Sequence, residues 1–361
     1  MKDMCNKTIL FVLLLLAVTN NAMAGSPSAP DQPSNGPGGS DYQHKEVLHT
    51  GPYWVNDKQT KESDKYFIFK PAAPMPEEAP VFLFIHGWGA IAPTTYQAYI
   101  DHIVKKGYIV VWTQYQRNEL HEAPILTFPW LYTKKIIIMW KDALKRLDED
   151  GSPIRPARNE QGNIKTAIVG HSAGGLLAVV VAAKSQIKRK EMPKPYAVMA
   201  VEPGALGIFA FGPFWNIDPD TKIIFVVGDE DNILCRSGAV RLWRLTSQIP
   251  TGNKQFLLVK SDYHGKPEQI ANHYFPGTSG ARDTAAVDAR DFYITFKLTV
   301  GLLNCAFKNT DCEYALANGG HEQLYMGEWS DGQPITPMVL VHDPESLTTT
   351  CHDPGLKGIF E

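Results

Sequence analysis

The chain has 361 residues, of which 44% are hydrophobic and 20% charged, and its formal net charge is −3. This is the composition of an ordinary globular protein that is long enough to bury a large core. The nearly neutral charge gives no sign of the strongly basic surface that nucleic-acid binding requires, so we expect no nucleic-acid partner.

The N-terminal 24 residues have the pattern of a secretory signal peptide. Lys2 and Lys7 precede an apolar run over residues 9–18, and Ala-Met-Ala at residues 22–24 supplies a small-residue cleavage site. The apolar run is only about half of the ~20 residues that a membrane-spanning helix needs. We therefore expect cleavage near Ala24, export to the periplasm or the extracellular space, and no stable membrane anchor.

Two segments lie outside the regular core of the predicted domain. Residues 25–45 are rich in Gly, Pro and Ser and have no apolar period, which predicts a flexible linker. Residues 309–361 are less regular than the chain before them, and we expect an irregular C-terminal extension packed on the same domain. No internal repeat or second domain is evident, so residues 46–361 are expected to fold as one domain.

Strands and helices alternate through the rest of the chain, which predicts a mostly parallel sheet with helices on both faces. The expected strands cover residues 47–54, 65–69, 81–85, 108–112, 167–169, 196–201, 223–227 and 256–259. The expected helices cover residues 94–106, 132–147, 175–183, 240–245 and 288–303. Two further apolar segments, residues 115–130 and 204–218, are candidates to cap a substrate cleft.

The cysteines predict two disulfides. Export removes Cys5 and leaves four of the five cysteines, an even number that is typical of disulfide pairing outside the cell. Cys305 and Cys312 are close in sequence, so we predict that they pair, which leaves Cys235 to pair with Cys351. A zinc site is not expected, because the chain has no Cys-x-x-Cys pair.

The most informative stretch is Gly-x-Ser-x-Gly, formed by Gly170, Ser172 and Gly174 between a predicted buried strand and a predicted buried helix. This is the context of a nucleophile elbow, in which the serine sits on a sharp strand-to-helix turn. Glycine is needed two residues either side of the serine, because a Cβ there would crowd the strand–helix crossing. Ser172 is therefore the candidate nucleophile.

A serine nucleophile needs a base that takes its proton and an acid that orients the base. The strand at 223–227 leads into Gly-Asp-Glu-Asp at residues 228–231, and the next strand leads into a loop that contains His264. Because both loops follow parallel strands, they are expected at the same edge of the sheet as Ser172. We predict Asp231 as the acid and His264 as the base. Other carboxylates that remain open as the acid are Asp229, Glu230 and Glu202.

Acyl transfer also needs N–H donors for the oxyanion that develops in the transition state. One is expected from the residue after the nucleophile, Ala173, and the other from the loop after the strand at 81–85. In that loop, His-Gly-Trp at residues 86–88, the best second donor is the backbone N–H of Trp88. His86 is expected to be structural, and His171 to lie under the elbow and shape the pocket.

Together, Gly-His-Ser-Ala-Gly-Gly, the His-Gly-Trp loop, Gly-Asp-Glu-Asp and the late histidine resemble the α/β-hydrolase superfamily over about residues 47–303. Within it the chain is most similar to exported bacterial esterases, lipases and the cutinase and polyester-hydrolase group. In the elbow, His171 and Ala173 replace the Trp and Met that are common in polyester hydrolases. The resemblance implies the α/β-hydrolase fold and a serine esterase that works through an acyl-enzyme without a metal or organic cofactor.

The expected substrate is an ester with an apolar or aromatic acyl part. Two other functions remain open at this point. A serine peptidase or amidase on the same fold would use the same triad, and a catalytically silent binding protein would keep the fold alone. A silent relative has no reason to retain a complete set of triad candidates, which argues against the second alternative. The sequence does not indicate the oligomeric state.

Overall fold

The computed structural model of the chain describes residues 25–58, 64–116, 130–149, 151–185, 187, 192–204, 212–280 and 285–348. Within these residues nine strands form one sheet in the order β1-β2-β5-β4-β7-β8-β9-β10-β11. From β5 to β10 all neighbouring strands are parallel. The strands β1 and β2 at one edge and β11 at the other are antiparallel to their neighbours.

The strands of this sheet are β1 (Glu46–Trp54), β2 (Lys65–Ala72), β4 (Val81–Ile85), β5 (Ile109–Gln114), β7 (Thr166–His171), β8 (Pro195–Val201), β9 (Lys222–Gly228), β10 (Lys254–Val259) and β11 (Val339–Leu340). A separate two-stranded sheet pairs β3 (Glu78–Ala79) with β6 (Arg155–Pro156). Every residue of β4, β5 and β7 is buried, as near-continuous apolar strands covered on both faces should be.

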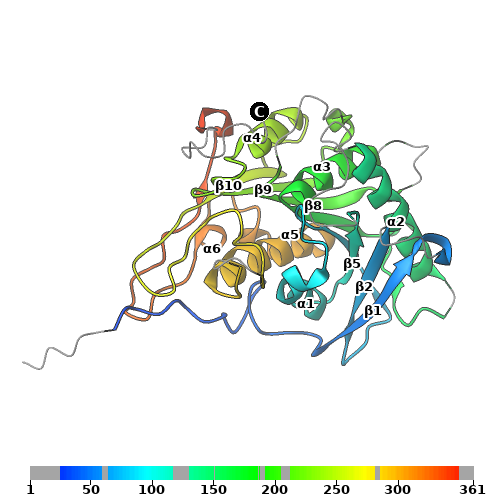
Figure 1. The fold of residues 1–361 in the computed structure, drawn as a ribbon, viewed down its shortest axis with the longest axis horizontal. Coiled ribbons are helices and arrows are strands. Elements are labelled where there is room, and N and C mark those ends of the chain that lie inside the picture. The colour runs from blue at the N-terminus through cyan, green and yellow to red at the C-terminus, as the bar shows by residue number, and fades with distance from the viewer. Residues whose placement is uncertain are drawn as a thin grey trace, which may run out of the picture.

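The helices are α1 (Gln97–Lys105), α2 (Trp130–Asp148), α3 (Ala173–Ser185), α4 (Ser237–Leu245), α5 (Lys297–Lys308) and α6 (His321–Leu324). Residues of α2, α3 and α4 pack into the core on one face of the sheet, and residues of α1 and α5 into the core on the other (Figure 1). Twelve buried residues make α3 apolar on all sides, because it lies between the sheet and neighbouring helices.

The predicted α/β-hydrolase architecture is confirmed, with changes at the ends of elements. The expected helix at 94–106 starts as a 3-10 turn, Pro93–Tyr96, before α1. The expected helix at 288–303 includes a π-helical stretch, Asp291–Phe296, and continues as α5 to Lys308.

Residues 25–45 differ from the flexible linker that their composition predicts, because they pack against the domain. The side chain of His102 is buried, and its Nε2 lies 2.7 Å from the carbonyl oxygen of Pro37. Lys106 donates from Nζ to the carbonyl oxygen of Gly36 at 2.8 Å. A Cβ on Gly38 would lie 2.0 Å from the carbonyl oxygen of Phe292. The glycines that suggested a linker are thus used for close backbone packing.

The C-terminal extension packs on the same domain over its described residues. The strand β11 pairs with β10, and the side chain of Trp329 is 1% exposed. Ser330 accepts at Oγ a hydrogen bond from the N–H of Ser28 over 3.0 Å. The extension therefore meets the N-terminal segment, and both lie beside the loop that follows β10.

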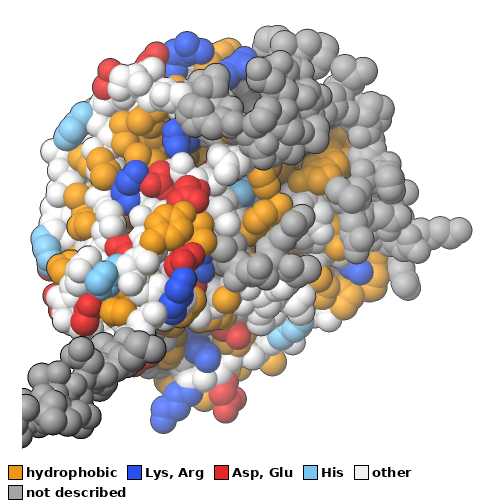
Figure 2. All heavy atoms as spheres, turned by 60° about the vertical axis from the view of Figure 1, so that its left-hand side comes forward, with side chains coloured by type: hydrophobic (Ala, Val, Ile, Leu, Met, Phe, Trp, Pro, Cys, Tyr) orange, Lys and Arg blue, Asp and Glu red, His pale blue; other side chains and the backbone are white. Residues whose placement is uncertain are grey.

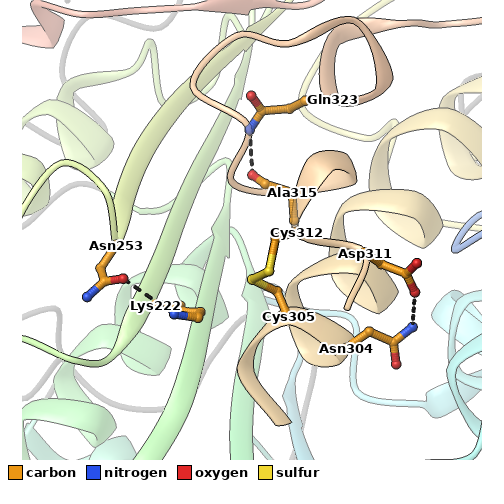
Figure 3. The surroundings of a disulfide bond; sticks show 8 residues. All are labelled: Lys222, Asn253, Asn304, Cys305, Asp311, Cys312, Ala315 and Gln323. Carbon is orange, nitrogen blue, oxygen red and sulfur yellow. Dashed lines mark hydrogen bonds between the residues drawn. A yellow bond between two sulfur atoms is a disulfide. The ribbon is translucent and has the colours of Figure 1, made fainter. Parts of the chain in front are cut away.

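The predicted disulfide between Cys305 and Cys312 is present and joins the end of α5 to the turn that follows it (Figure 3). Asn304 donates to Asp311 over 2.6 Å beside it, so side-chain bonds reinforce the same turn. Cys235 is also disulfide-bonded. Its expected partner, Cys351, lies outside the described residues, and the second pairing stays a prediction.

Surface and membrane features add two observations. Figure 2 shows acidic, basic and hydrophobic side chains interspersed on one face, as expected for a nearly neutral protein. Among the described residues, none of the helices is both long enough and apolar enough to cross a bilayer. The predicted signal peptide, residues 1–24, lies outside the described part of the chain, as do residues 117–129 and 205–211 of the two possible cap segments.

Candidate active site

Ser172 lies on a strained turn between β7 and α3. Its φ is 56°, in the left-handed region that residues other than glycine rarely adopt. Hydrogen bonds fix this backbone: the Ser172 N–H donates to the carbonyl of Val201 over 2.9 Å, and the Ser172 carbonyl accepts from the N–H groups of Gly175 and Gly204 at 2.9 and 2.8 Å. The side chain is half-buried. This is the geometry of a nucleophile elbow.

The residues two positions before and after Ser172 are glycines because neighbouring backbone atoms lie too close for a Cβ. A Cβ on Gly170 would lie 2.0 Å from the carbonyl oxygen of Gly174, and a Cβ on Gly174 would lie 2.1 Å from that of Ile85. Either contact would push the strand and the helix apart. The physical reason that the sequence suggested for the motif therefore holds in the structure.

The histidine that reaches Ser172 is His273, and the prediction of His264 is wrong on this geometry. The Nε2 of His273 lies 2.9 Å from the Oγ of Ser172, and its Nδ1 lies 3.0 Å from the Oδ2 of Asp231. His264 instead bonds through Nε2 to the Oδ2 of Asp331 at 2.7 Å, with 31% of its side chain exposed.

The path of the loop after β10 explains the difference. Asp262 and Gln269 bond to each other through both backbone groups, at 2.9 and 2.8 Å, so the chain reverses between them and turns His264 outward. Ala271 then returns to the sheet edge, where its carbonyl accepts the N–H of Glu230 over 3.1 Å. This return brings His273 over the elbow. In the sequence, the only signal was a second histidine in the same loop.

Asp231 is the carboxylate that bonds His273, and it follows β9 as the sequence indicated. Its side chain is fully buried, and its Oδ1 accepts the N–H groups of Ile233 and Leu234 at 2.8 and 3.0 Å. Burial by itself raises the pKa of Asp231. This effect is outweighed by the hydrogen bond and charge of His273 and by the hydrogen bonds to Oδ1, which all lower the pKa. The pKa falls well below its usual range, so Asp231 is ionised at neutral pH.

Glu202, one of the alternative acids, lies behind Asp231 at the end of β8. Its Oε1 accepts the N–H of Gly228 over 2.6 Å, and its carboxyl group shares a side-chain hydrogen bond with Asp231. Burial first, and then the negative charge of Asp231, raise the pKa of Glu202 well above its usual value. The buried site therefore favours the neutral carboxylic acid form of Glu202, which is unsuited to orient a histidine as an anion.

The other two alternative acids serve local structure. Asp229 accepts both the N–H and the hydroxyl of Ser261 at 2.9 Å and pairs with Lys260 at 2.6 Å. Glu230 is bonded by the hydroxyl of Tyr263. Neither carboxylate contacts His273 in the hydrogen bonds of the described residues.

Glu202, Asp231 and His273 are also the one group of described residues whose donor atoms, all within 4.8 Å, are clustered closely enough for a metal ion. The facing lone pairs of Asp231 already accept hydrogen bonds from His273 and from backbone N–H groups. The donor set thus fits a hydrogen-bonded triad better than a metal site.

The predicted oxyanion donors lie at the two elements that meet at Ser172. Ala173 is the first residue of α3, so its N–H points out of the helix terminus, where no earlier carbonyl is available. Trp88 lies in the loop after β4, between Gly87, whose N–H donates to the hydroxyl of Tyr96 over 3.1 Å, and Gly89, whose N–H donates to Gln116 over 2.9 Å. The assignment of these N–H groups to an oxyanion stays a prediction.

The loop that contains Trp88 is held against the elbow. A Cβ on Gly87 would lie 3.3 Å from the Cβ of Ser172. The Trp88 side chain is 37% exposed and packs edge-on against Tyr132 at 5.5 Å between ring centroids. His86 is fully buried beneath the loop, where it donates from Nδ1 to the carbonyl of Gly87 over 2.7 Å, and burial lowers its pKa to about 4.

Comparison with known proteins agrees with this geometry. The family model described as Chlorophyllase matches residues 43–207, and it represents an esterase family of the α/β-hydrolase type. The chain has the α/β-hydrolase fold. The match indicates, more broadly, an ester hydrolase. A search of curated proteins finds no match.

The matched part of this α/β-hydrolase extends from β1 through β8. It includes the loop with Trp88 and the elbow with Ser172. Asp231 and His273 follow beyond residue 207, so their assignment rests on the hydrogen bonds of the structure alone. The exported and bacterial character suggested by the resemblance stays a prediction.

Proposed function

We propose that this α/β-hydrolase is an exported serine hydrolase that cleaves carboxylic esters through a covalent acyl-enzyme. The observation that carries the proposal is the pair of hydrogen bonds on His273, at 2.9 Å to Ser172 and 3.0 Å to Asp231. Nucleophile, base and acid are in hydrogen-bond contact in the order that a Ser-His-Asp triad needs. The match to an esterase family supports an ester substrate over an amide.

In this mechanism Nε2 of His273 takes the proton of Ser172 as Oγ attacks the ester carbonyl carbon. The carbonyl oxygen becomes an oxyanion, which accepts hydrogen bonds from the N–H groups of Ala173 and Trp88. His273 then gives its proton to the leaving alcohol, and an acyl group remains on Ser172. Asp231 holds the ring and stabilises the imidazolium, and water completes the cycle through the same steps.

The proposed substrate is an ester with an apolar or aromatic acyl part. Support comes from the half-exposed indole of Trp88 beside the elbow and from the small, buried Ala173 at the start of α3. Both side chains are apolar. Export is supported by the leader pattern of the sequence and by the disulfide between Cys305 and Cys312, which is typical of proteins outside the cytosol.

The test is a hydrolysis screen with nitrophenyl esters of graded acyl length beside the corresponding nitroanilides. We expect ester cleavage that exceeds amide cleavage, and a single fluorophosphonate label that Ser172→Ala abolishes. Preferential cleavage of the anilides would make the protein an amidase. A folded wild type that neither cleaves any ester nor takes the label would leave the silent binding protein as the better interpretation.

A further inference from the structure

Behind Ser172, a line of buried hydrogen bonds joins the loop with Trp88 to the loop with His273. The N–H of Gly87 donates to the hydroxyl oxygen of Tyr96 over 3.1 Å. That oxygen lies 2.8 Å from Nδ1 of His171, and Nε2 of His171 lies 2.9 Å from the backbone carbonyl oxygen of His273. The side chain of His273 bonds Ser172, so the line runs around the nucleophile from one side to the other.

The chemistry of the acceptors permits one direction for these hydrogen bonds. A carbonyl oxygen only accepts, so the Nε2 of His171 must carry a proton and donate to His273. In a neutral ring Nδ1 is then an acceptor, and the Tyr96 hydroxyl donates to it. The oxygen of Tyr96 keeps a lone pair for the N–H of Gly87. Every polar group in the line has a partner, and the alternative tautomer would leave two acceptors facing each other.

Burial keeps this arrangement in place. Tyr96 is 1% exposed and His171 is 7% exposed. Burial, and secondly the neighbouring His273, lower the pKa of His171 to about 3, so the ring is neutral across the physiological range. In a low-dielectric interior, loss of one partner leaves its neighbours unpaired at high cost.

The two side chains in this line of hydrogen bonds belong to elements next to the site. Tyr96 ends the 3-10 turn before α1, and His171 is the last residue of β7, directly before Ser172. A Cβ on Gly87 would lie 3.1 Å from the Tyr96 oxygen and 3.2 Å from Nδ1 of His171, so the loop rests on both side chains. Movement of Gly87 would carry the N–H of the next residue, Trp88, with it.

We propose that Tyr96 and His171 are positioning residues, which hold the loop of Trp88 and the backbone of His273 in a fixed relation to Ser172. The inference rests on the proposed ester hydrolysis. Neither side chain is placed to touch a substrate or a reacting atom. They act through the N–H that meets the oxyanion and through the base, and a misplacement of about 1 Å at such groups is enough to slow catalysis strongly.

The test compares Tyr96→Phe with Tyr99→Phe in the exported protein. Tyr99 is a matched control: it lies in the next turn of the chain, is also 1% exposed, and bonds through its hydroxyl to Thr299, away from the elbow. With a nitrophenyl ester, we expect Tyr96→Phe to lower kcat by about 10- to 100-fold with KM within about twofold, less than removal of an oxyanion donor. Tyr99→Phe should keep kcat near wild type.

A second pair of variants tests the other positioning residue without altering Tyr96. His171→Ala removes both hydrogen bonds, whereas the amide oxygen of His171→Asn can still accept from the Tyr96 hydroxyl. We expect His171→Ala to lower kcat as Tyr96→Phe does, and His171→Asn to restore part of the loss at unchanged KM. Circular dichroism and thermal melting of each variant separate this effect from unfolding.

The outcomes distinguish this inference from the proposed function. If wild type cleaves the ester, Ser172→Ala does not, and folded Tyr96→Phe has the same kcat as Tyr99→Phe, the positioning role is overturned while ester hydrolysis stands. A rise in KM alone, or equal activity of the two His171 variants, would also overturn it. A folded wild type without esterase activity would overturn the proposed function, and this inference with it.

Discussion

Replacement of His273 by alanine is the sharpest test of the triad, because the same loop supplies a matched control in His264. Each histidine bonds an aspartate, His273 at 3.0 Å to Asp231 and His264 at 2.7 Å to Asp331. Only His273 also reaches Ser172. The two substitutions therefore remove the same side chain from the same loop and differ in whether they remove the base.

The structure predicts very different losses of kcat for the two substitutions. Without His273 the hydroxyl of Ser172 has no base, and loss of a triad histidine lowers kcat by about 10⁶-fold. That corresponds to roughly 8 kcal/mol of transition-state stabilisation. The pair of His264 and Asp331 is solvent-exposed, with 31% and 43% of its side chains accessible, and water screens it. His264→Ala should leave kcat within about twofold of wild type.

The assay is turnover of one nitrophenyl ester by both variants, with fluorophosphonate labelling of the same preparations and circular dichroism to confirm folding. We expect His273→Ala to lose both turnover and labelling, and His264→Ala to keep both. A folded His273→Ala enzyme that works near the wild-type rate would refute the assignment. A folded but inactive His264→Ala would restore His264 as the base and imply that the loop after β10 rearranges.

Two further predictions concern buried titratable groups. Asp231→Asn should lower kcat by about 10⁴-fold by favouring the wrong histidine tautomer. Glu202→Gln, which replaces a neutral acid by a neutral amide, should lower kcat by about tenfold at most. An inactive, folded Glu202→Gln beside an active Asp231→Asn would move the role of the acid to Glu202. Burial lowers the pKa of Lys297 to about 7, so between about pH 7 and 10 the unfolded chain binds more protons and the free energy of unfolding should rise with pH. Lys297→Met should flatten this rise in urea midpoints measured across that range, and an unchanged pH dependence in the variant would contradict the assignment.

Local chemistry was enough to predict the sheet, the strained turn that carries Ser172, and the position of Asp231 at the end of β9. The residues Val-Phe-Leu-Phe-Ile of β4 are apolar on both faces of the strand, so both faces must be covered, which requires helices on each side of the sheet. Ser172 was recognisable because the glycines at 170 and 174 fit a crossing that has no room for a Cβ. The apolar run of β9 shows where that strand ends. Asp231 comes shortly after this end, so the sequence predicts that it lies at the edge of the sheet.

Tertiary structure alone decided which histidine contacts Ser172 and where residues 25–45 lie. The loop after β10 has no hydrophobic period, and its course depends on the bonds between Asp262 and Gln269 and on the return of Ala271 to the sheet edge. No spacing in the sequence encodes those contacts. The prediction of a flexible linker is wrong for a related reason. Gly and Pro indicate a segment without its own periodic structure, but the same residues allow the backbone of Gly38 to approach Phe292. Whether such a segment is ordered depends on the surface against which it packs.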